Sequence, residues 1–267
     1  MSILQTTELK KYYGAKPNIT RALDGVTLSI EKGEFVAIVG TSGSGKSTLL
    51  NMIGGLDVPT SGKVIVDGRE LSTLKDEQLT IFRRRKIGFI FQNYNLVPVL
   101  NVYENIVLPV ELDGNKVDKK FMKEVVQMLG LEDKLNNMPN NLSGGQQQRV
   151  GIARALALNP KFIVCDEPVS ALDVSIQAQI LNLLMDLQDE LGITYMFITH
   201  NMSVVRHISH NICVMYLGQL VETSPTKELF SKPLHPYTKA LLSAIPSTDI
   251  HHKKERIILK GELVSPI

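Results

Sequence analysis

The chain has 267 residues, a formal net charge of +2, 43% hydrophobic residues and 21% charged residues. This composition is ordinary for a folded globular protein, and the charge is too balanced to indicate nucleic-acid binding. No apolar stretch approaches the roughly 20 residues of a membrane-spanning helix, and the first residues lack the apolar segment of a signal peptide. We therefore expect a cytoplasmic protein without direct membrane insertion.

The cysteines and the one strongly basic run agree with this expectation. Cys165 and Cys213 lie in apolar runs typical of strands, which favours buried thiols over a disulfide and a reducing compartment. The basic run at residues 83–86 is interpreted as a solvated surface rather than as a nucleic-acid patch.

Apolar runs predict several short strands in the first half of the chain. EFVAIV (residues 34–39) is the first, and a glycine loop and a helix from about Lys46 follow it. KVIVDG (63–68) and KIGFIFQ (86–92) are further candidates. From about residue 93 to residue 141 the periodicity is helical, in segments 101–112 and 118–131.

The second half alternates strands with a helix. KFIVCDEP (161–168) and ITYMFITH (193–200) are apolar strands that end on polar residues. Residues 174–191 between them predict an amphipathic helix whose apolar stripe consists of Ile176, Ile180, Leu183, Leu184 and Leu187. This order predicts a parallel α/β sheet, and residues 211–222 predict a later hairpin around Gly218.

A phosphate-binding loop follows the first of these strands. GTSGSGKS, starting at Gly40, fits the pattern G-x-x-x-x-G-K-[ST] and lies between a predicted strand and a predicted helix, as the pattern requires. Its glycines let backbone N–H groups surround a β-phosphate. Lys46 supplies a charge to the β- and γ-phosphate oxygens, and Ser47 can bind Mg²⁺.

Polar residues at the ends of other strands complete a candidate catalytic set. Asp166 ends a buried strand and is expected to bind Mg²⁺ through water, whereas Glu167 is suited to polarising an attacking water. His200 ends another strand and could contact a γ-phosphate. Gln92 stands where the helical insertion departs, which suits a hinge between nucleotide and insertion.

A second nucleotide motif is interpreted as a chance match. NKVD (115–118) fits the guanine-reading pattern N-K-x-D, but it lies between two helical segments instead of following a buried strand. Asp118 is therefore predicted to be the N-cap of the next helix.

The stretch NNLSGGQQQRVGIARAL (140–156) places two glycines after a serine at the start of a helix, which is typical of a further anion site. Together these features resemble the ATP-binding cassette (ABC) ATPases over about residues 3–245. In that resemblance the site residues are Gly40, Thr41, Ser42, Gly43, Ser44, Gly45, Lys46, Ser47 and Thr48 of Walker A; the Q-loop Gln92; Ser143, Gly144, Gly145 and Gln146 of the signature; Asp166 of Walker B with the base Glu167; Asp173 of the D-loop; and the switch His200. The aromatic residue that stacks on adenine falls on Tyr13, with Tyr12 as the alternative.

The resemblance implies an α/β fold, with a P-loop NTPase (RecA-like) core, an antiparallel β subdomain and an α-helical insertion subdomain. The core and β subdomain are expected at residues 1–92 and 149–230, and the helical subdomain ending in the signature at 93–148. A C-terminal extension is expected at 231–267. It is interpreted either as a helix packing on the core or as a regulatory or partner-binding element.

The resemblance also implies an ATPase that uses ATP and Mg²⁺, the latter held by Ser47, Gln92 and Asp166. Two cassettes, identical or different, would pack head to tail, with each signature binding the γ-phosphate of the other cassette's ATP. The expected partners are this second cassette, transmembrane permease subunits and an extracytoplasmic binding protein. The chain would then lie peripherally on the inner face of the cell membrane. ABC ATPases of DNA repair carry a coiled-coil insertion and those of translation carry two cassettes, and the sequence shows neither feature.

At a finer level the resemblance divides. Residues 20–148 resemble macrolide-exporter, lipoprotein-release and bacitracin-resistance cassettes, whereas residues 151–246 resemble oligopeptide and dipeptide importer cassettes, above all in KPLHPYTKALLSAIP and the later GELVSP. The division suggests a mosaic with a crossover near residues 146–152. Oligopeptide transport is the leading hypothesis. An export-type cassette and an uncoupled chimeric ATPase are the alternatives.

Overall fold

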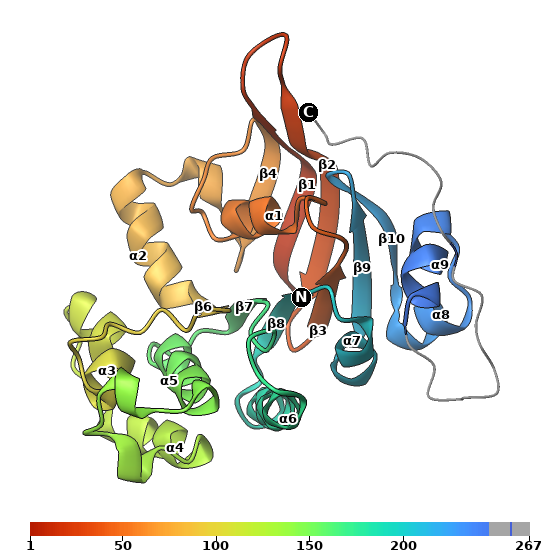
Figure 1. Ribbon diagram of the computed structural model, residues 1–267. Coiled ribbons are helices and arrows are strands. Elements are labelled where there is room, and N and C mark those ends of the chain that lie inside the picture. Colours follow the sequence, from red (N-terminus) through yellow and green to blue (C-terminus); the bar gives the residue numbers. More distant parts are fainter. Residues whose placement is uncertain (246–256, 258–267) are drawn as a thin grey trace, which may run out of the picture. The chain divides into compact units, whose positions relative to one another are not determined.

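The computed structural model describes residues 1–245 and Ile257, and its chain forms two compact units (Figure 1). The first unit combines Met1–Thr73 with the chain from Met196 onward, and the second is Leu74–Tyr195. The boundaries of the helical subdomain and of the core that the sequence suggests stay a prediction.

An antiparallel sheet in the first unit has the strand order β2-β1-β4-β5. Its strands are β1 (Ser2–Tyr13), β2 (Thr20–Glu31), β4 (Ser61–Val66) and β5 (Arg69–Glu70). Val26, Leu28 and Ile30 of β2 are buried and the residues between them are exposed. This alternation is the pattern of a strand with one face on the core.

A second group of strands in the first unit has the order β10-β9-β3-β8. These are β3 (Phe35–Val39), β8 (Thr194–Thr199, which begins in the second unit), β9 (Asn211–Tyr216) and β10 (Gln219–Pro225). β3 runs parallel to β9, and all five of its residues are buried. A continuous apolar run of this kind is typical of a parallel strand covered on both faces. The β9–β10 hairpin turns at Leu217 and Gly218, which confirms the predicted hairpin.

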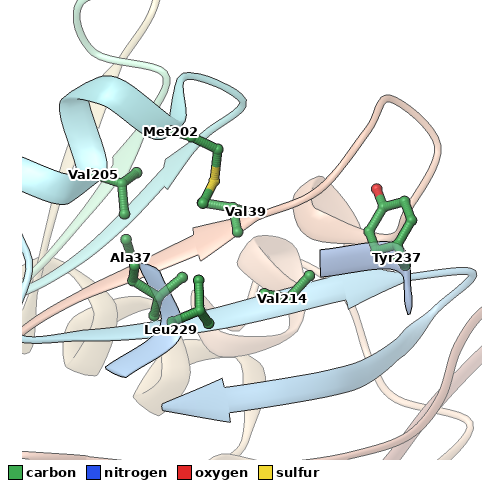
Figure 2. Close-up of a cluster of buried hydrophobic side chains, with 8 residues drawn as sticks. Ala37, Val39, Met202, Val205, Val214, Leu229 and Tyr237 are labelled. Atoms are coloured by element: carbon green, nitrogen blue, oxygen red, sulfur yellow. The ribbon is translucent and has the colours of Figure 1, made fainter. Parts of the chain in front are cut away.

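The C-terminal helices of the described chain are part of the apolar core next to β3. α7 (Met202–Ile208), α8 (Thr226–Ser231) and α9 (Pro236–Ser243) supply side chains to one buried cluster. Figure 2 shows this cluster, which consists of Ala37, Val39, Met202, Val205, Ile212, Val214, Leu229 and Tyr237. Residues far apart in the sequence therefore support the strand that leads into the phosphate loop, which continues into α1 (Lys46–Ile53).

The second unit is mostly helical. Its elements are α2 (Asp76–Lys86), β6 (Ile87–Phe91), α3 (Val102–Leu112), α4 (Lys119–Met128), α5 (Gly144–Leu156), β7 (Phe162–Asp166) and α6 (Val174–Leu191). β6 and β7 pair in parallel. Single-turn 3₁₀ helices lie at Leu71–Thr73 in the first unit and at Glu132–Lys134 and Pro139–Asn141 in the second.

The predicted strands and helices named above are confirmed, each within a few residues of its expected position. Asp118 is the N-cap of α4, and its carboxylate accepts from the N–H groups of Lys120 and Phe121, which confirms the capping interpretation of NKVD. Both cysteines are buried and unbonded to each other, as predicted.

The expected stripe of α6 is partly correct. Ile180, Leu184 and Leu187 are buried, but Leu183 is half-buried and Leu181 is buried instead. The basic run at the end of α2 is also only partly solvated, because its side chains Arg84 and Arg85 pair with a carboxylate.

The carboxylate that receives these arginines belongs to Asp113, whose side chain is 1% exposed. Arg84 Nη1 lies 3.2 Å from Oδ1 and Arg85 Nε lies 2.8 Å from Oδ2. Arg84 and Arg85 therefore form ion pairs within the second unit. Within the described part of the chain, the helices all fall short of the length and apolar character that crossing a bilayer requires.

Candidate nucleotide-binding site

The phosphate loop connects β3 to α1 and can be formed only with glycine at its key positions. A Cβ on Gly40 would collide with the carbonyl oxygen of Met215 and come within 2.6 Å of Ser44 Oγ. A Cβ on Gly45 would lie 2.5 Å from the carbonyl oxygen of Ala22, and its φ of 101° is in the region that favours glycine. The backbone of the loop is thus closely packed against its neighbours.

Lys46 brings a positive charge into this loop. Its Nζ donates to the carbonyl oxygens of Gly40 at 2.8 Å and Thr41 at 2.9 Å, and the residue is 8% exposed. α1 starts at Lys46, and Leu49 N–H makes a helical bond to Gly45 O. The N–H groups before Leu49 point along the positive end of the helix dipole, so this terminus suits a phosphate.

The loop also meets the chemical requirement for a magnesium ligand. Ser47 is exposed on the first turn of α1, so its hydroxyl oxygen is accessible. Mg²⁺ prefers oxygen ligands, and the Ser47 hydroxyl is a ligand of this kind. The predicted magnesium set of Ser47, Gln92 and Asp166 stays a prediction. In the described residues, no cluster of three or more His, Cys, Asp or Glu side chains offers an alternative metal site.

Of the two neighbouring tyrosines, Tyr13 is the better placed near the phosphate loop. Its ring is 41% exposed, its hydroxyl donates to Asp57 Oδ2 at 2.9 Å, and Lys11 Nζ lies 4.9 Å from the ring centre. Burial and the Asp57 carboxylate raise the pKa of Tyr13, and a hydrogen bond with the hydroxyl of Thr48 acts in the opposite direction. Thr48 belongs to the phosphate-loop motif, so Tyr13 lies beside this motif, and its contact with adenine stays a prediction.

Tyr12 is engaged elsewhere. Its hydroxyl donates to Asp24 Oδ1 at 2.5 Å, and the guanidinium of Arg21 lies 5.7 Å from its ring centre. Both partners belong to β2. His200, also in the first unit, is exposed directly after β8, the neighbour of β3 in the sheet.

The second unit brings Gln92, Asp166 and Glu167 to one sheet edge. Phe91 of β6 is in register with Asp166 of β7, so the residues that follow each strand emerge side by side. Ligand sites of parallel α/β sheets form beyond the carboxyl ends of strands. This edge therefore has the geometry expected for the magnesium and water-activating residues.

The backbone of Glu167 is held in an uncommon conformation. Its φ is 45°, in the left-handed region, and its carbonyl oxygen accepts from Ser170 N–H at 3.2 Å and Ser170 Oγ at 2.7 Å. Non-glycine residues in this region cost energy and are enriched at functional sites. The uncommon backbone of Glu167 is compatible with a functional role at this edge.

The signature lies at the N-terminus of α5 and is closed by a capping box. Ser143 Oγ accepts from Gln146 N–H at 3.3 Å, and Gln146 Oε1 accepts from Ser143 N–H at 2.9 Å. A Cβ on Gly144 would lie 2.9 Å from Tyr94 Oη, and one on Gly145 would lie 2.7 Å from Ile176 Cγ2. These glycines are thus needed for packing, and their role in anion binding stays a prediction.

Asp173 caps the N-terminus of α6. Its carboxylate accepts from Ile176 N–H at 2.9 Å. Its expected contact with nucleotide stays a prediction.

Two further residues of this region escaped the sequence analysis. Tyr94 and Asn95 have φ values of 54° and 49°, and the guanidinium of Arg154 in α5 donates to both of their carbonyl oxygens. Burial lowers the pKa of Arg154. Arg154 thus fixes the segment that follows Gln92 to the signature helix. Positive φ at a tyrosine has no sequence pattern, so nothing in the sequence pointed to it.

Family models match most of the chain. Residues 23–170 match the model described as ABC transporter, and residues 221–266 match the C-terminal region of oligopeptide/dipeptide transporters. Residues 246–256 and 258–266 of the second match, which include GELVSP, lie outside the described residues.

Curated relatives align over the full chain. The putative oligopeptide transport ATP-binding protein YkfD of Bacillus subtilis is 46% identical over 100% of this chain and 84% of its own length. The dipeptide transport ATP-binding protein DppF of Escherichia coli is 43% identical over 99% of this chain and 83% of its own length. Because relatives of one type match the chain from end to end, the mosaic interpretation is not supported.

Solved structures confirm the predicted fold. The dimeric post-hydrolysis state of the ATP-binding cassette MJ0796, bound to ADP and Pi, is 42% identical with a TM-score of 0.75, over 84% of this chain and 98% of that chain. CbiO1 from Clostridium perfringens, part of an ABC transporter complex, is 30% identical with a TM-score of 0.77, over 86% of this chain and 91% of that chain.

Proposed function

The chain belongs to the ATP-binding, ATP-hydrolysing subunits of ABC transporters, and we propose that it energises the import of oligopeptides or dipeptides. The observation that carries this proposal is the match of residues 221–266 to the oligopeptide/dipeptide transporter C-terminal region. The names of YkfD, a putative oligopeptide transport protein, and DppF, a dipeptide transport protein, agree with it, and both align over at least 99% of this chain.

In the proposed site, residues 40–48 bind the phosphates of ATP. The close-packed glycine backbone, the buried Lys46 and the start of α1 support this role. Tyr13 is proposed to contact adenine and His200 the γ-phosphate. When bound, Mg²⁺ would neutralise phosphate charge, with Ser47, Gln92 and Asp166 as its protein neighbours.

Glu167 is proposed as the base that polarises the attacking water. Glu167 follows the same strand end as Asp166, at the edge shared with Gln92, and its backbone is held in the left-handed region. A carboxylate in this position can accept a proton from water as the water attacks phosphorus.

The signature is proposed to act on a second cassette. Ser143, Gly144, Gly145 and Gln146 form a helix N-terminus suited to an anion, and the chain already contains a separate phosphate loop. The relative MJ0796 is a dimer in its ADP- and Pi-bound state. A head-to-tail dimer, in which each signature and Asp173 face the partner's nucleotide, would use both anion sites.

The remaining partners are proposed from the same family membership. They are transmembrane permease subunits and, for an importer, an extracytoplasmic binding protein. The chain would then be a cytoplasmic subunit held peripherally at the inner face of the cell membrane.

Peptide uptake tests the transport proposal. Cells that lack this chain are given the wild type or Glu167→Gln, and the uptake of a radiolabelled dipeptide and tripeptide is measured. The wild type should restore uptake, and Glu167→Gln should not, although it should accumulate as an ATP-bound dimer in size-exclusion chromatography. Unchanged turnover by Glu167→Gln would contradict the assignment of the base.

Affinity purification of the wild-type chain from the membranes of these cells identifies the permease. Capture of peptide-importer permease subunits is the expected result. Capture of an exporter or lipoprotein-release subunit would replace the proposal by an export-type function. Active enzyme without any captured membrane subunit would indicate an uncoupled ATPase.

A further inference from the structure

A tyrosine of the C-terminal segment is hydrogen-bonded to the phosphate loop. The N–H of Thr41 donates to the hydroxyl oxygen of Tyr237 at 2.8 Å, and this hydroxyl donates to Thr41 Oγ1 at 3.1 Å. The two residues are 196 positions apart, and both belong to the first compact unit. One hydroxyl thus satisfies two polar groups of the same loop residue.

The ring of Tyr237 is held firmly in place. The residue is 4% exposed, and its ring packs against that of Tyr216 with the centres 4.2 Å apart and the planes tilted by 30°. It joins the apolar cluster of Figure 2, where its hydroxyl points away from the aliphatic side chains. Little conformational freedom is left to the hydroxyl, so its contact with the loop is preorganised.

The start of α9 is anchored as well. His235 Nδ1 accepts from Tyr237 N–H at 3.2 Å, and the carboxylate of Glu222 accepts from the N–H groups of Leu234 and His235, each at 2.9 Å. Glu222 belongs to β10. The position of Tyr237 is therefore set by the sheet that carries the loop, and not by the helix alone.

Thr41 connects the Tyr237 hydroxyl, through further hydrogen bonds, to the groups proposed to bind phosphate. Its carbonyl oxygen accepts from Lys46 Nζ at 2.9 Å and from Ser44 N–H at 3.2 Å. On the far side of the loop, Gly218 N–H donates to Ser44 O at 3.0 Å. A change in the orientation of Thr41 would therefore displace both the lysine and the loop backbone.

We propose that Tyr237 is a positioning residue for the phosphate loop, through which the peptide-transporter C-terminal segment sets the affinity for ATP. The inference rests on the proposed phosphate role of residues 40–48. The hydroxyl contacts the loop and not the reacting groups. It should therefore stabilise the complex with bound ATP and the transition state equally. Its loss should raise KM and leave kcat nearly unchanged.

The test removes only this hydroxyl. In the full-length chain, Tyr237→Phe should raise KM for ATP and the Kd for the non-hydrolysable analogue AMP-PNP at least about twofold, because it removes two hydrogen bonds and one alone corresponds to about two- to tenfold. The value of kcat should stay within about twofold. Tyr216→Phe is the matched control, because it makes the same chemical change in the neighbouring ring without a contact to Thr41, and it should leave both constants unchanged.

A double-mutant cycle tests whether the change in ATP affinity acts through the contact between Tyr237 and Thr41. Thr41→Val removes the Oγ1 partner, so the combined variant with Tyr237→Phe should lose less affinity than the sum of the two single variants. Additive losses of affinity would mean that the two side chains act independently, and would overturn the inference. A fall in melting temperature and in kcat with KM unchanged would mean that Tyr237 has only a structural role, and would overturn the inference.

Lys46→Ala separates this inference from the site itself. If Lys46→Ala still binds AMP-PNP like the wild type, the assignment of the phosphate loop is wrong. If Lys46→Ala abolishes binding and Tyr237→Phe binds like the wild type, the loop is correctly assigned and the role of Tyr237 is wrong.

Discussion

Replacing Arg154 by alanine should destabilise the segment that follows Gln92. The guanidinium donates to the carbonyl oxygen of Tyr94 at 2.7 Å and also to that of Asn95, and both acceptors have positive φ. A hydrogen bond from a charged group contributes about 1.5–3 kcal/mol to stability. The substitution also removes the unfavourable burial of the guanidinium charge, which offsets part of the stability lost with the two hydrogen bonds. We expect Arg154→Ala to lower the free energy of unfolding by about 2–4 kcal/mol.

Arg149 offers a matched control in the same helix. Its guanidinium makes longer contacts, 3.4 Å to Leu129 O and 3.2 Å to Gln179 Oε1, so Arg149→Ala should cost less than about 1 kcal/mol. Urea unfolding followed by circular dichroism gives both values, and hydrogen exchange should show faster exchange at residues 93–97 in Arg154→Ala alone. Equal losses in the two variants, or unchanged exchange at 93–97, would refute the reasoning.

Three other predictions concern packing, thiol reactivity and acid stability. Gly144→Ala should cost about 1–3 kcal/mol in urea unfolding, because the new Cβ would lie 2.9 Å from a tyrosine hydroxyl, whereas Gly151→Ala, whose Cβ would find its nearest atom at 3.7 Å, should be neutral or stabilising. Burial raises the pKa of the Cys213 thiol to about 11 and that of Cys165 further, so neither should react with a disulfide reagent at pH 8 until the protein is unfolded. A lysine hydrogen bond holds the pKa of Asp57 below its usual value, so this carboxylate contributes stability above its unfolded pKa that is lost as the pH falls through its folded pKa. Asp57→Asn should therefore show a smaller loss of unfolding free energy between pH 7 and pH 3 than the wild type.

The strands and loops that carry the motifs could be predicted because their causes are local. β3 is an apolar run between glycines, and the phosphate loop needs glycine wherever its backbone approaches Met215 or Ala22. The Ser143–Gln146 capping box likewise lies within four consecutive residues. Patterns of this kind are present in the sequence itself, whatever the rest of the chain does.

The elements that escaped prediction have weak or interrupted patterns. β1 and β2 pair with several register shifts, which break the alternation of apolar and polar residues. α2 is almost entirely polar, and Phe82 is its one buried residue. Its structure depends on the two arginines that meet Asp113, a contact about 28 residues away in the sequence.

The side-chain contacts of the site depend on still longer separations. Arg154 meets Tyr94 across 60 positions, and Tyr237 meets Thr41 across 196. No local pattern specifies which carbonyl or hydroxyl a side chain will reach over such a distance. The chemical identity of the site could therefore be predicted, while the residues that hold it in place could not.

The C-terminal segment shows one of the two roles that the sequence left as alternatives, and the regulatory or partner-binding role stays a prediction. Leu241 and Leu242 of α9 pack against the buried cluster that contains Ala37 and Val39 of β3, which is the behaviour of a helix packed on the core. Tyr237 belongs to the same cluster but directs a hydroxyl to the loop that β3 leads into. Truncating the segment would remove both, so the stability loss would hide any effect on ATP. Only a change confined to the Tyr237 hydroxyl separates the support of the loop from the support of the fold.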